Sequence, residues 1–183
     1  KFGISFTAQH LNQAGALVHV YTDGSIHLNH GGTEMGQGLN IKVAQVVAQV
    51  FGVSIERIGI SETRTDKVPN TSPTAASSGS DLNGMAALNA ATKIKQRLID
   101  FLISQHGVSA DDIVFSHDQV HYANKSQSFT ELVNAAYMNR ISLSANGYYC
   151  TPKIHFDAEK GEGRPFFYFS HGVALTEVEI DTL

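Results

Sequence analysis

The chain has 183 residues, 42% of them hydrophobic, so it can bury a core without needing disulfides or a structural metal. Its 13 basic and 17 acidic residues give a formal charge of -4, which offers no attraction for nucleic acid or an anionic membrane. A lone cysteine, Cys150, excludes an internal disulfide, and no run of about 20 apolar residues indicates a membrane span. We expect a cytoplasmic protein in which Cys150 is a buried apolar residue.

A β-hairpin is the first predicted element. Residues 16–20 and 25–28 are apolar runs on either side of Thr22-Asp23-Gly24, and an Asp-Gly step between such runs is typical of a tight turn. Apolar residues then recur at a spacing of three and four, which predicts an amphipathic helix that ends at Gly52. These residues are Leu39, Val43, Val46, Val47, Val50 and Phe51. Residues 58–61 are predicted to form a short strand, so the order is strand, helix, strand.

A second helix is predicted after the polar segment 69–80, whose prolines and hydroxyl residues prevent a regular helix. Ser80 or Asp81 is expected to cap this helix. Its predicted apolar face contains Leu82, Met85, Ala86, Ala90, Ile94, Leu98 and Phe101. Further along, we expect a helix over residues 129–138 and strands near Val120, 166–169 and 173–180. The predicted fold class is α+β (mixed α/β), with sheets that support packed helices and two loops at helix N-termini.

Both loops could hold a ligand. Residues 31–38 and 69–80 each open a helix, so free N–H groups and the positive helix end could face the same negatively charged molecule. Ile41 replaces the third glycine of a dinucleotide fingerprint and no Gly-Lys-Ser/Thr ending follows, which disfavours standard nucleotide folds. The residues alone leave ordinary alternatives open: a glycine turn for the first loop and a solvated connection for the second.

Other polar residues carry weaker signals. Glu34 could act as a general base, but a carboxylate at the edge of a turn is more often a helix cap or a solvated charge. His117 and His121 are four residues apart in a stretch without helical character, so metal ligation there is disfavoured. Cys150 has no neighbouring base in the sequence, and no Gly-x-Ser-x-Gly motif marks a hydrolase nucleophile.

Several longer strings carry a more specific signal. They are KFGISFT at residues 1–7, LNQAGA at 11–16, GGTEMGQG at 31–38, VPNTSPTAAS at 68–77, PFFYFSHGVA at 165–174 and EVEID at 177–181. Together they resemble the xanthine dehydrogenase/oxidase branch of the molybdenum hydroxylases, over essentially the whole chain. The resemblance implies that residues 1–183 are a fragment of the molybdopterin-binding domain, truncated at both ends.

The resemblance also implies roles for individual residues. The cofactor contacts would be Met35, Gly36, Gln37, Thr74, Ala75, Ala76 and Ser77. Ala76 would lie beside the molybdenum without being a side-chain ligand. Phe6 would pack against the purine ring of the substrate, and Thr7 would face it.

The implied chemistry is the oxidation of xanthine or hypoxanthine with oxygen taken from water, the electrons leaving through 2Fe-2S clusters and FAD of the full enzyme. The family's general-base glutamate lies in a Gly-Glu-Pro segment that this chain lacks, so we expect that glutamate beyond Leu183. We therefore assign no catalytic residue in this chain and expect the fragment alone to be inactive. Expected partners are the remaining molybdenum-domain segments and the iron-sulfur and FAD domains or subunits of an oligomer, without nucleic acid or membrane. The alternatives are an aldehyde oxidase-like or other heterocycle hydroxylase, and a non-catalytic assembly module.

Overall fold

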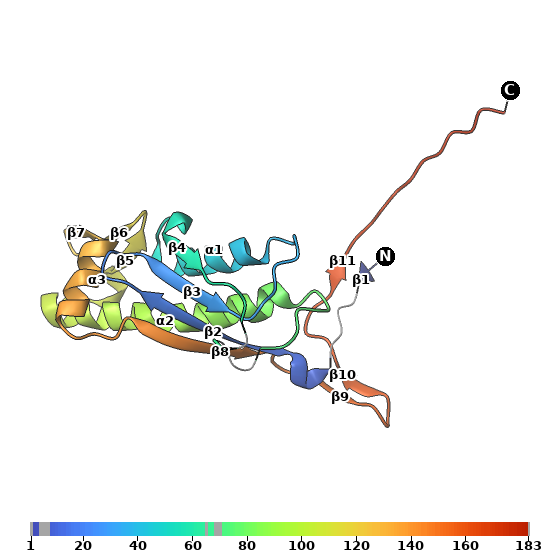
Figure 1. The fold of residues 1–183 in the computed structure, drawn as a ribbon, viewed down its shortest axis with the longest axis horizontal. Coiled ribbons are helices and arrows are strands. Elements are labelled where there is room, and N and C mark those ends of the chain that lie inside the picture. Colours follow the sequence, from blue (N-terminus) through green and yellow to red (C-terminus); the bar gives the residue numbers. More distant parts are fainter. Residues whose placement is uncertain (1, 4–7, 65, 68–70, 183) are drawn as a thin grey trace.

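A four-stranded sheet with two helices on one face forms the centre of the structure, a computed structural model that describes residues 2–3, 8–64, 66–67 and 71–182 (Figure 1). The strand order is β4-β3-β2-β8, with β4 parallel to β3 and the other pairs antiparallel. The strands are β2 (Gln13–Val20), β3 (Ile26–His30), β4 (Ile58–Ile60) and β8 (Ser144–Cys150). The helices are α1 (Leu39–Phe51) and α2 (Gly79–His106), and three 3-10 turns are η1 (Gln9–Leu11), η2 (Ile55–Arg57) and η3 (Ala110–Asp112).

The predicted hairpin is confirmed as the pair β2 and β3. Gly24 has a φ of 81°, which glycine adopts at low cost, and the Asp23 carboxylate accepts the Ser25 backbone N–H at 2.9 Å. Inward-facing residues of β2 alternate with outward-facing ones, since successive side chains of a strand point to opposite faces. The hairpin therefore presents one apolar face to the helices.

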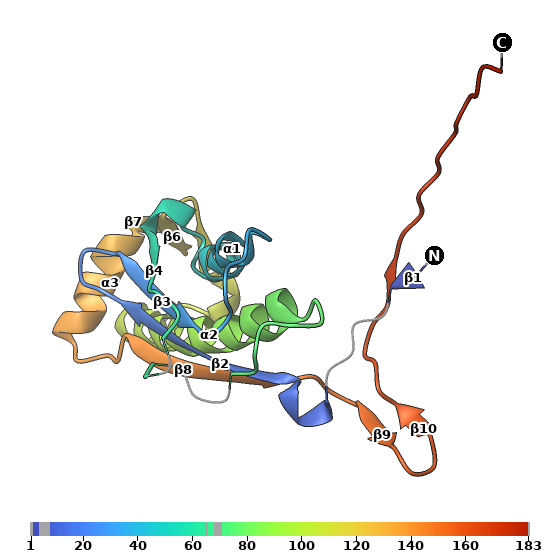
Figure 2. The same ribbon diagram turned by 45° about the vertical axis from the view of Figure 1, so that its right-hand side comes forward.

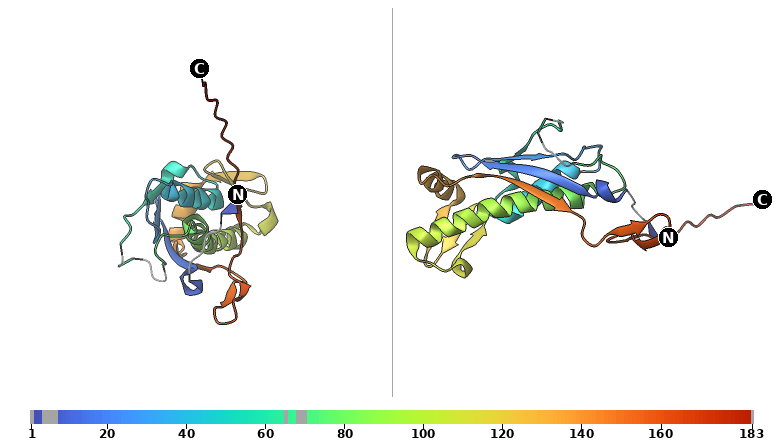
Figure 3. Two further views of the ribbon diagram at one scale, coloured as in Figure 1. Left: turned by 90° about the vertical axis from the view of Figure 1, so that its right-hand side faces the viewer. Right: turned by 90° about the horizontal axis from the view of Figure 1, so that it is seen from below.

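Helix α1 is confirmed and ends at Gly52, which has a φ of 63°. Helix α2 begins one residue after Ser78, so the prediction that Ser80 or Asp81 caps it is wrong, and both lie inside its first turn. Its predicted apolar face is buried at every position except Met85, which is 37% exposed. Viewed from below, α2 runs along the sheet (Figure 3).

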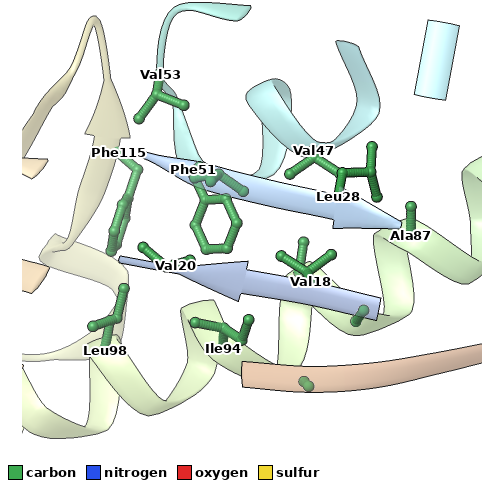
Figure 4. Close-up of a cluster of buried hydrophobic side chains, with 14 of the residues drawn as sticks. Val18, Val20, Leu28, Val47, Phe51, Val53, Ala87, Ile94, Leu98 and Phe115 are labelled. Atoms are coloured by element: carbon green, nitrogen blue, oxygen red, sulfur yellow. The ribbon is translucent and has the colours of Figure 1, made fainter. Parts of the chain in front are cut away.

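The core lies between the sheet and the two helices (Figure 4). Val18 and Leu28 from the strands meet Val47 and Phe51 from α1 and Ile94 from α2, and all five are fully buried. Burial on this scale is the main favourable contribution to folding. It fixes α1 and α2 relative to each other, and so fixes the loops from which they start.

A smaller antiparallel sheet packs at one end of this core. Its strands are β5 (Val114–Ser116), β6 (Gln119–Tyr122) and β7 (Lys125–Ser128), followed by α3 (Phe129–Met138). The predicted strand near Val120 and helix over 129–138 are thus confirmed. Ser128 and Glu131 form a capping box at the start of α3, and Phe129 packs against Phe51 with ring centroids 5.5 Å apart.

The C-terminal region differs from the prediction. It contains β9 (His155–Asp157) paired with β10 (Glu162–Arg164), and β11 (Ser170–His171) paired with β1 (Phe2–Gly3). The strands predicted at 166–169 and 173–180 are wrong for this structure: residues 166–169 lie in the connection between β10 and β11. Residues 172–182 extend away from the rest of the chain (Figure 2), and a strand needs a neighbour to pair with. Cys150 is exposed rather than buried, since it lies at the end of β8 on the sheet face opposite the helices.

Across the residues that the structure describes, the helices lack the combination of length and apolar character needed to cross a membrane.

Candidate functional site

The loops that open α1 and α2 lie at the same end of the molecule (Figure 1). They surround one cavity of about 460 Å³. We define the first loop as residues 31–38 and the second loop as residues 71–78. The cavity is lined by Met35, Gln37, Leu39 and Lys42 on one side and by Thr74, Ala75, Ala76, Ser77, Gly79 and Ser80 on the other. The structure thus brings together most of the residues predicted to contact the cofactor. Gly36 lies between two of them, whereas Phe6 and Thr7 lie outside the described residues.

A hydrogen bond joins the two loops directly. The backbone N–H of Thr33 donates to Thr74 Oγ1 at 2.8 Å. Next to it, Gly32 passes between the helices so closely that a Cβ there would lie 2.5 Å from Leu39 Cδ2 and 2.8 Å from Asn83 Nδ2. A side chain at this position would require the ends of these two side chains to move, so glycine suits the close approach.

The Gln37 side chain folds back onto its own loop. Its Oε1 accepts the Met35 N–H at 2.6 Å and its Nε2 donates to the Thr33 carbonyl at 2.9 Å. Lys42 Nζ donates to the Gln37 carbonyl at 2.9 Å. A carboxamide has a second N–H and further lone pairs, so these bonds orient Gln37 and leave capacity for a ligand.

Glu34 caps the start of α1, as the more conservative interpretation of the sequence predicted. Its Oε1 accepts the N–H groups of Gly36 and Gly38 at 2.9 and 3.0 Å, and its Oε2 accepts that of Asn40 at 3.0 Å. The Asn40 bond, followed by the others, lowers the pKa of the carboxyl. The expectation that this helix end offers free N–H groups to a ligand is therefore wrong for these amides, because the chain's own carboxylate already occupies them.

The second loop has an unusual backbone. Ala76 and Ser77 both have a φ of 56°, in the left-handed region that non-glycine residues rarely adopt. The side chain of Ser78, the N-cap residue of α2, makes no capping hydrogen bond. Four short side chains of this loop line the cavity, those of Thr74, Ala75, Ala76 and Ser77.

A C-terminal tyrosine supports the start of α2. Burial raises the pKa of Asp81, and a hydrogen bond from Tyr168 lowers it in part. Burial and then the negative charge of Asp81 raise the pKa of Tyr168 to about 12. The segment around Tyr168 therefore contacts the helix that carries the second loop.

His30 lies buried beneath the first loop. Its Nδ1 accepts the Gly32 N–H at 3.2 Å, so this nitrogen is unprotonated and the imidazole is neutral. Burial lowers its pKa, and the Asn40 side chain and the charge of Glu34 oppose this shift.

Sequence reasoning missed Lys42, Asp81 and Tyr168. The sequence pointed only to Lys42, because a cation in the first turn of a helix interacts unfavourably with the positive end of the helix dipole. Such a placement suggests that the cation has a role in binding. Asp81 was considered only as a cap, and its link to Tyr168 depends on the tertiary structure.

A second cavity, of about 860 Å³, lies between α1 and the turn that joins β5 to β6. Asp118, its charged residue, already pairs with Arg57 Nε at 2.5 Å and accepts the Ser54 N–H. Because this carboxylate is used within the fold, the cavity between the loops is the stronger candidate site.

Comparison with known proteins gives a consistent result. The family model described as molybdopterin cofactor-binding domain matches residues 1–183. Xanthine dehydrogenase from Oryza sativa subsp. japonica is 51% identical over 183 residues, and xanthine dehydrogenase/oxidase from Gallus gallus is 50% identical. Each match covers 100% of this chain and 12% of the relative, so the chain spans about an eighth of their length.

Solved structures share the fold. Quinoline 2-oxidoreductase from Pseudomonas putida 86 superposes with a TM-score of 0.69 and 25% identity, over 75% of this chain and 19% of that one. A Cu,Mo-CO dehydrogenase gives 0.68 and 26%, over 78% and 19%. These neighbours confirm the predicted mixed α/β class. Because the family model covers the whole chain, as the resemblance of its strings predicted, the chain belongs to the molybdopterin cofactor-binding domain family.

Proposed function

We propose that this chain forms one wall of the molybdenum cofactor site in a xanthine dehydrogenase-like hydroxylase. The observation that carries the proposal is the shared cavity: two loops, far apart in sequence, meet there and are joined by the Thr33 to Thr74 hydrogen bond. The proposed cofactor contacts are Met35, Gly36, Gln37, Thr74, Ala75, Ala76 and Ser77.

The residues around the cavity suit a molybdopterin. The Gln37 carboxamide and the loop backbone can pair with the ring heteroatoms of a pterin, and the Lys42 ammonium provides positive charge for its phosphate. The bound cofactor supplies the redox chemistry at molybdenum. This chain's residues bind and orient it, and the small side chain of Ala76 leaves space beside the metal.

Met35 is 67% exposed, so the cavity is open on that side of this chain. We propose that other segments of the full-length protein cover it and supply the general-base glutamate, the 2Fe-2S clusters and the FAD. The whole protein would then be an oligomeric enzyme of the cytoplasm, and the isolated chain would be inactive.

For the substrate we propose a purine, xanthine or hypoxanthine, with Phe6 and Thr7 as its contacts in this chain. The relatives named xanthine dehydrogenase support this choice, at about 50% identity. A hydroxylase of another heterocycle is the alternative, supported by the structural likeness to quinoline 2-oxidoreductase.

The proposal is tested by filling the space next to the expected metal. In the full-length protein, Ala76→Leu is expected to reduce molybdenum and pterin content about tenfold or more, since overpacking of this size costs about 1.4–3 kcal/mol. Ala110→Leu, at an exposed position in η3, is the matched control and should keep the wild-type content. Wild-type molybdenum content in Ala76→Leu would contradict the proposed site. Reduction of the metal centre by xanthine, and not by quinoline, supports the purine over the alternative.

A further inference from the structure

The Glu34 carboxylate fills a position that helix N-termini ordinarily offer to bound anions. Its oxygens accept three backbone N–H groups, from Gly36, Gly38 and Asn40, all at 3.0 Å or less. Such amides, together with the helix dipole, attract phosphate and carboxylate groups. Here the anion is part of the loop itself.

Several other polar groups of the first loop are also bonded within the protein. The N–H of Thr33 is bonded to Thr74, that of Met35 to Gln37 Oε1, and the carbonyl of Gln37 to Lys42. A loop whose backbone groups are bonded in this way has few competing conformations, so it does not depend on a ligand for its shape.

We propose that Glu34 is a positioning residue, which holds the first loop in its cofactor-binding shape and excludes free anions such as inorganic phosphate from the start of α1. The proposal rests on the proposed function only in taking molybdopterin as the ligand of the loop. Glu34 does not touch the reacting atoms. It acts through the backbone of Met35, Gly36 and Gln37.

The electrostatics support this role. The bonds from Asn40, Gly38 and Gly36 lower the pKa of Glu34, so its carboxylate stays ionised throughout the neutral pH range. A second anion at these amides would meet both the charge of Glu34 and a set of donors already in use. Lys42, bonded to the Gln37 carbonyl, is the cation left at the cavity for the anionic end of a ligand.

Glu34→Gln tests the proposal, because it keeps the size of the side chain and removes the charge. One oxygen of the amide can still accept the Gly36 and Gly38 bonds, but its NH₂ group then faces the Asn40 N–H, and two donors repel. The matched control is Glu131→Gln, which removes a carboxylate that accepts the Ser128 backbone N–H at the start of α3 and does not line the cavity.

The first measurement is hydrogen exchange of the full-length protein. The protein is produced in a host that does not synthesise molybdopterin, so that it carries no cofactor. In peptides covering residues 35–40, Glu34→Gln is expected to raise the exchange rate about tenfold, as the loss of one charge-assisted bond implies. Glu131→Gln should leave these peptides unchanged. Equal protection in Glu34→Gln and wild type would overturn the proposal.

Inorganic phosphate is the second probe. It is expected to slow exchange in residues 35–40 of Glu34→Gln and to have no effect on the wild-type protein. Phosphate protection of the wild-type loop would show that Glu34 excludes nothing.

The third measurement adds molybdopterin. Glu34→Gln is expected to bind it about tenfold more weakly than wild type, with unchanged turnover per bound molybdenum. Reduced turnover per molybdenum at wild-type affinity would contradict a positioning role. If the wild-type protein itself takes up no molybdopterin, the proposed function fails, while the exchange and phosphate measurements still decide the role of Glu34.

Discussion

Gly147 on β8 determines how closely α2 can approach the sheet, and Gly147→Ala is the most direct test of the fold that supports the site. A Cβ at this position would lie 1.9 Å from the carbonyl oxygen of Ala86 and 2.6 Å from the backbone nitrogen of Ala90. Ordinary contact begins near 3.4 Å, so α2 and β8 must separate by roughly 1.5 Å.

The expected cost is about 3 kcal/mol in the free energy of unfolding, at the upper end of the range for overpacking. The reason is that the clashing atoms belong to backbone, and no side chain can rotate away. For the same reason, Ala86→Gly is not expected to rescue Gly147→Ala.

Urea unfolding of the chain measures the effect, with Gly59→Ala on β4 as the matched control. Both glycines lie in strands of the same sheet, but a Cβ at Gly59 would meet nothing within 4 Å, and its substitution should be neutral or stabilising by up to about 1 kcal/mol. A cost for Gly147→Ala equal to that of the control, or rescue by Ala86→Gly, would refute the packing argument.

Two further predictions follow from named contacts. Arg97 of α2 donates to the carbonyls of Ser142 and Ser144 at 3.0 and 2.9 Å, so Arg97→Ala should lower the free energy of unfolding by about 1–2 kcal/mol. The control is Gln96→Ala at the exposed neighbouring position, which should lower it by clearly less. Equal losses in the two variants would refute the role of these bonds. Because burial lowers the pKa of His30, the unfolded chain binds a proton below pH 6.5 that the folded chain does not, and stability should fall as the pH is lowered through this window. His30→Gln should reduce that slope in a urea titration, and an unchanged slope would show that His30 does not contribute.

Local signals in the sequence predicted several elements correctly. The Asp23-Gly24 turn, the helix ending at Gly52 and the helix over residues 129–138 depend on interactions within a few residues, which periodicity and turn chemistry express directly. The long strings identified the family because such a resemblance depends only on the order of residues in the chain.

Strands were predicted less well at the C-terminus. Residues 173–180 alternate apolar and acidic side chains, yet Val173 is 95% exposed and Ile180 77% exposed. Alternation gives the pattern of a strand, but a strand also needs a partner that supplies backbone hydrogen bonds. The prediction that Cys150 is buried was wrong for a similar reason, because the position of α2 decides which face of β8 is covered.

By itself, the sequence determined which segments become helix or hairpin and which family the chain belongs to. Only the tertiary structure decided that Gln37 and Ala76 line the same cavity, that the Glu34 carboxylate accepts N–H groups at the start of α1, and that Tyr168 interacts with Asp81. The physical reason is range. Turns and helix caps are settled between near neighbours in the chain, whereas a site built from two distant loops exists only once the core has fixed both helices on one sheet.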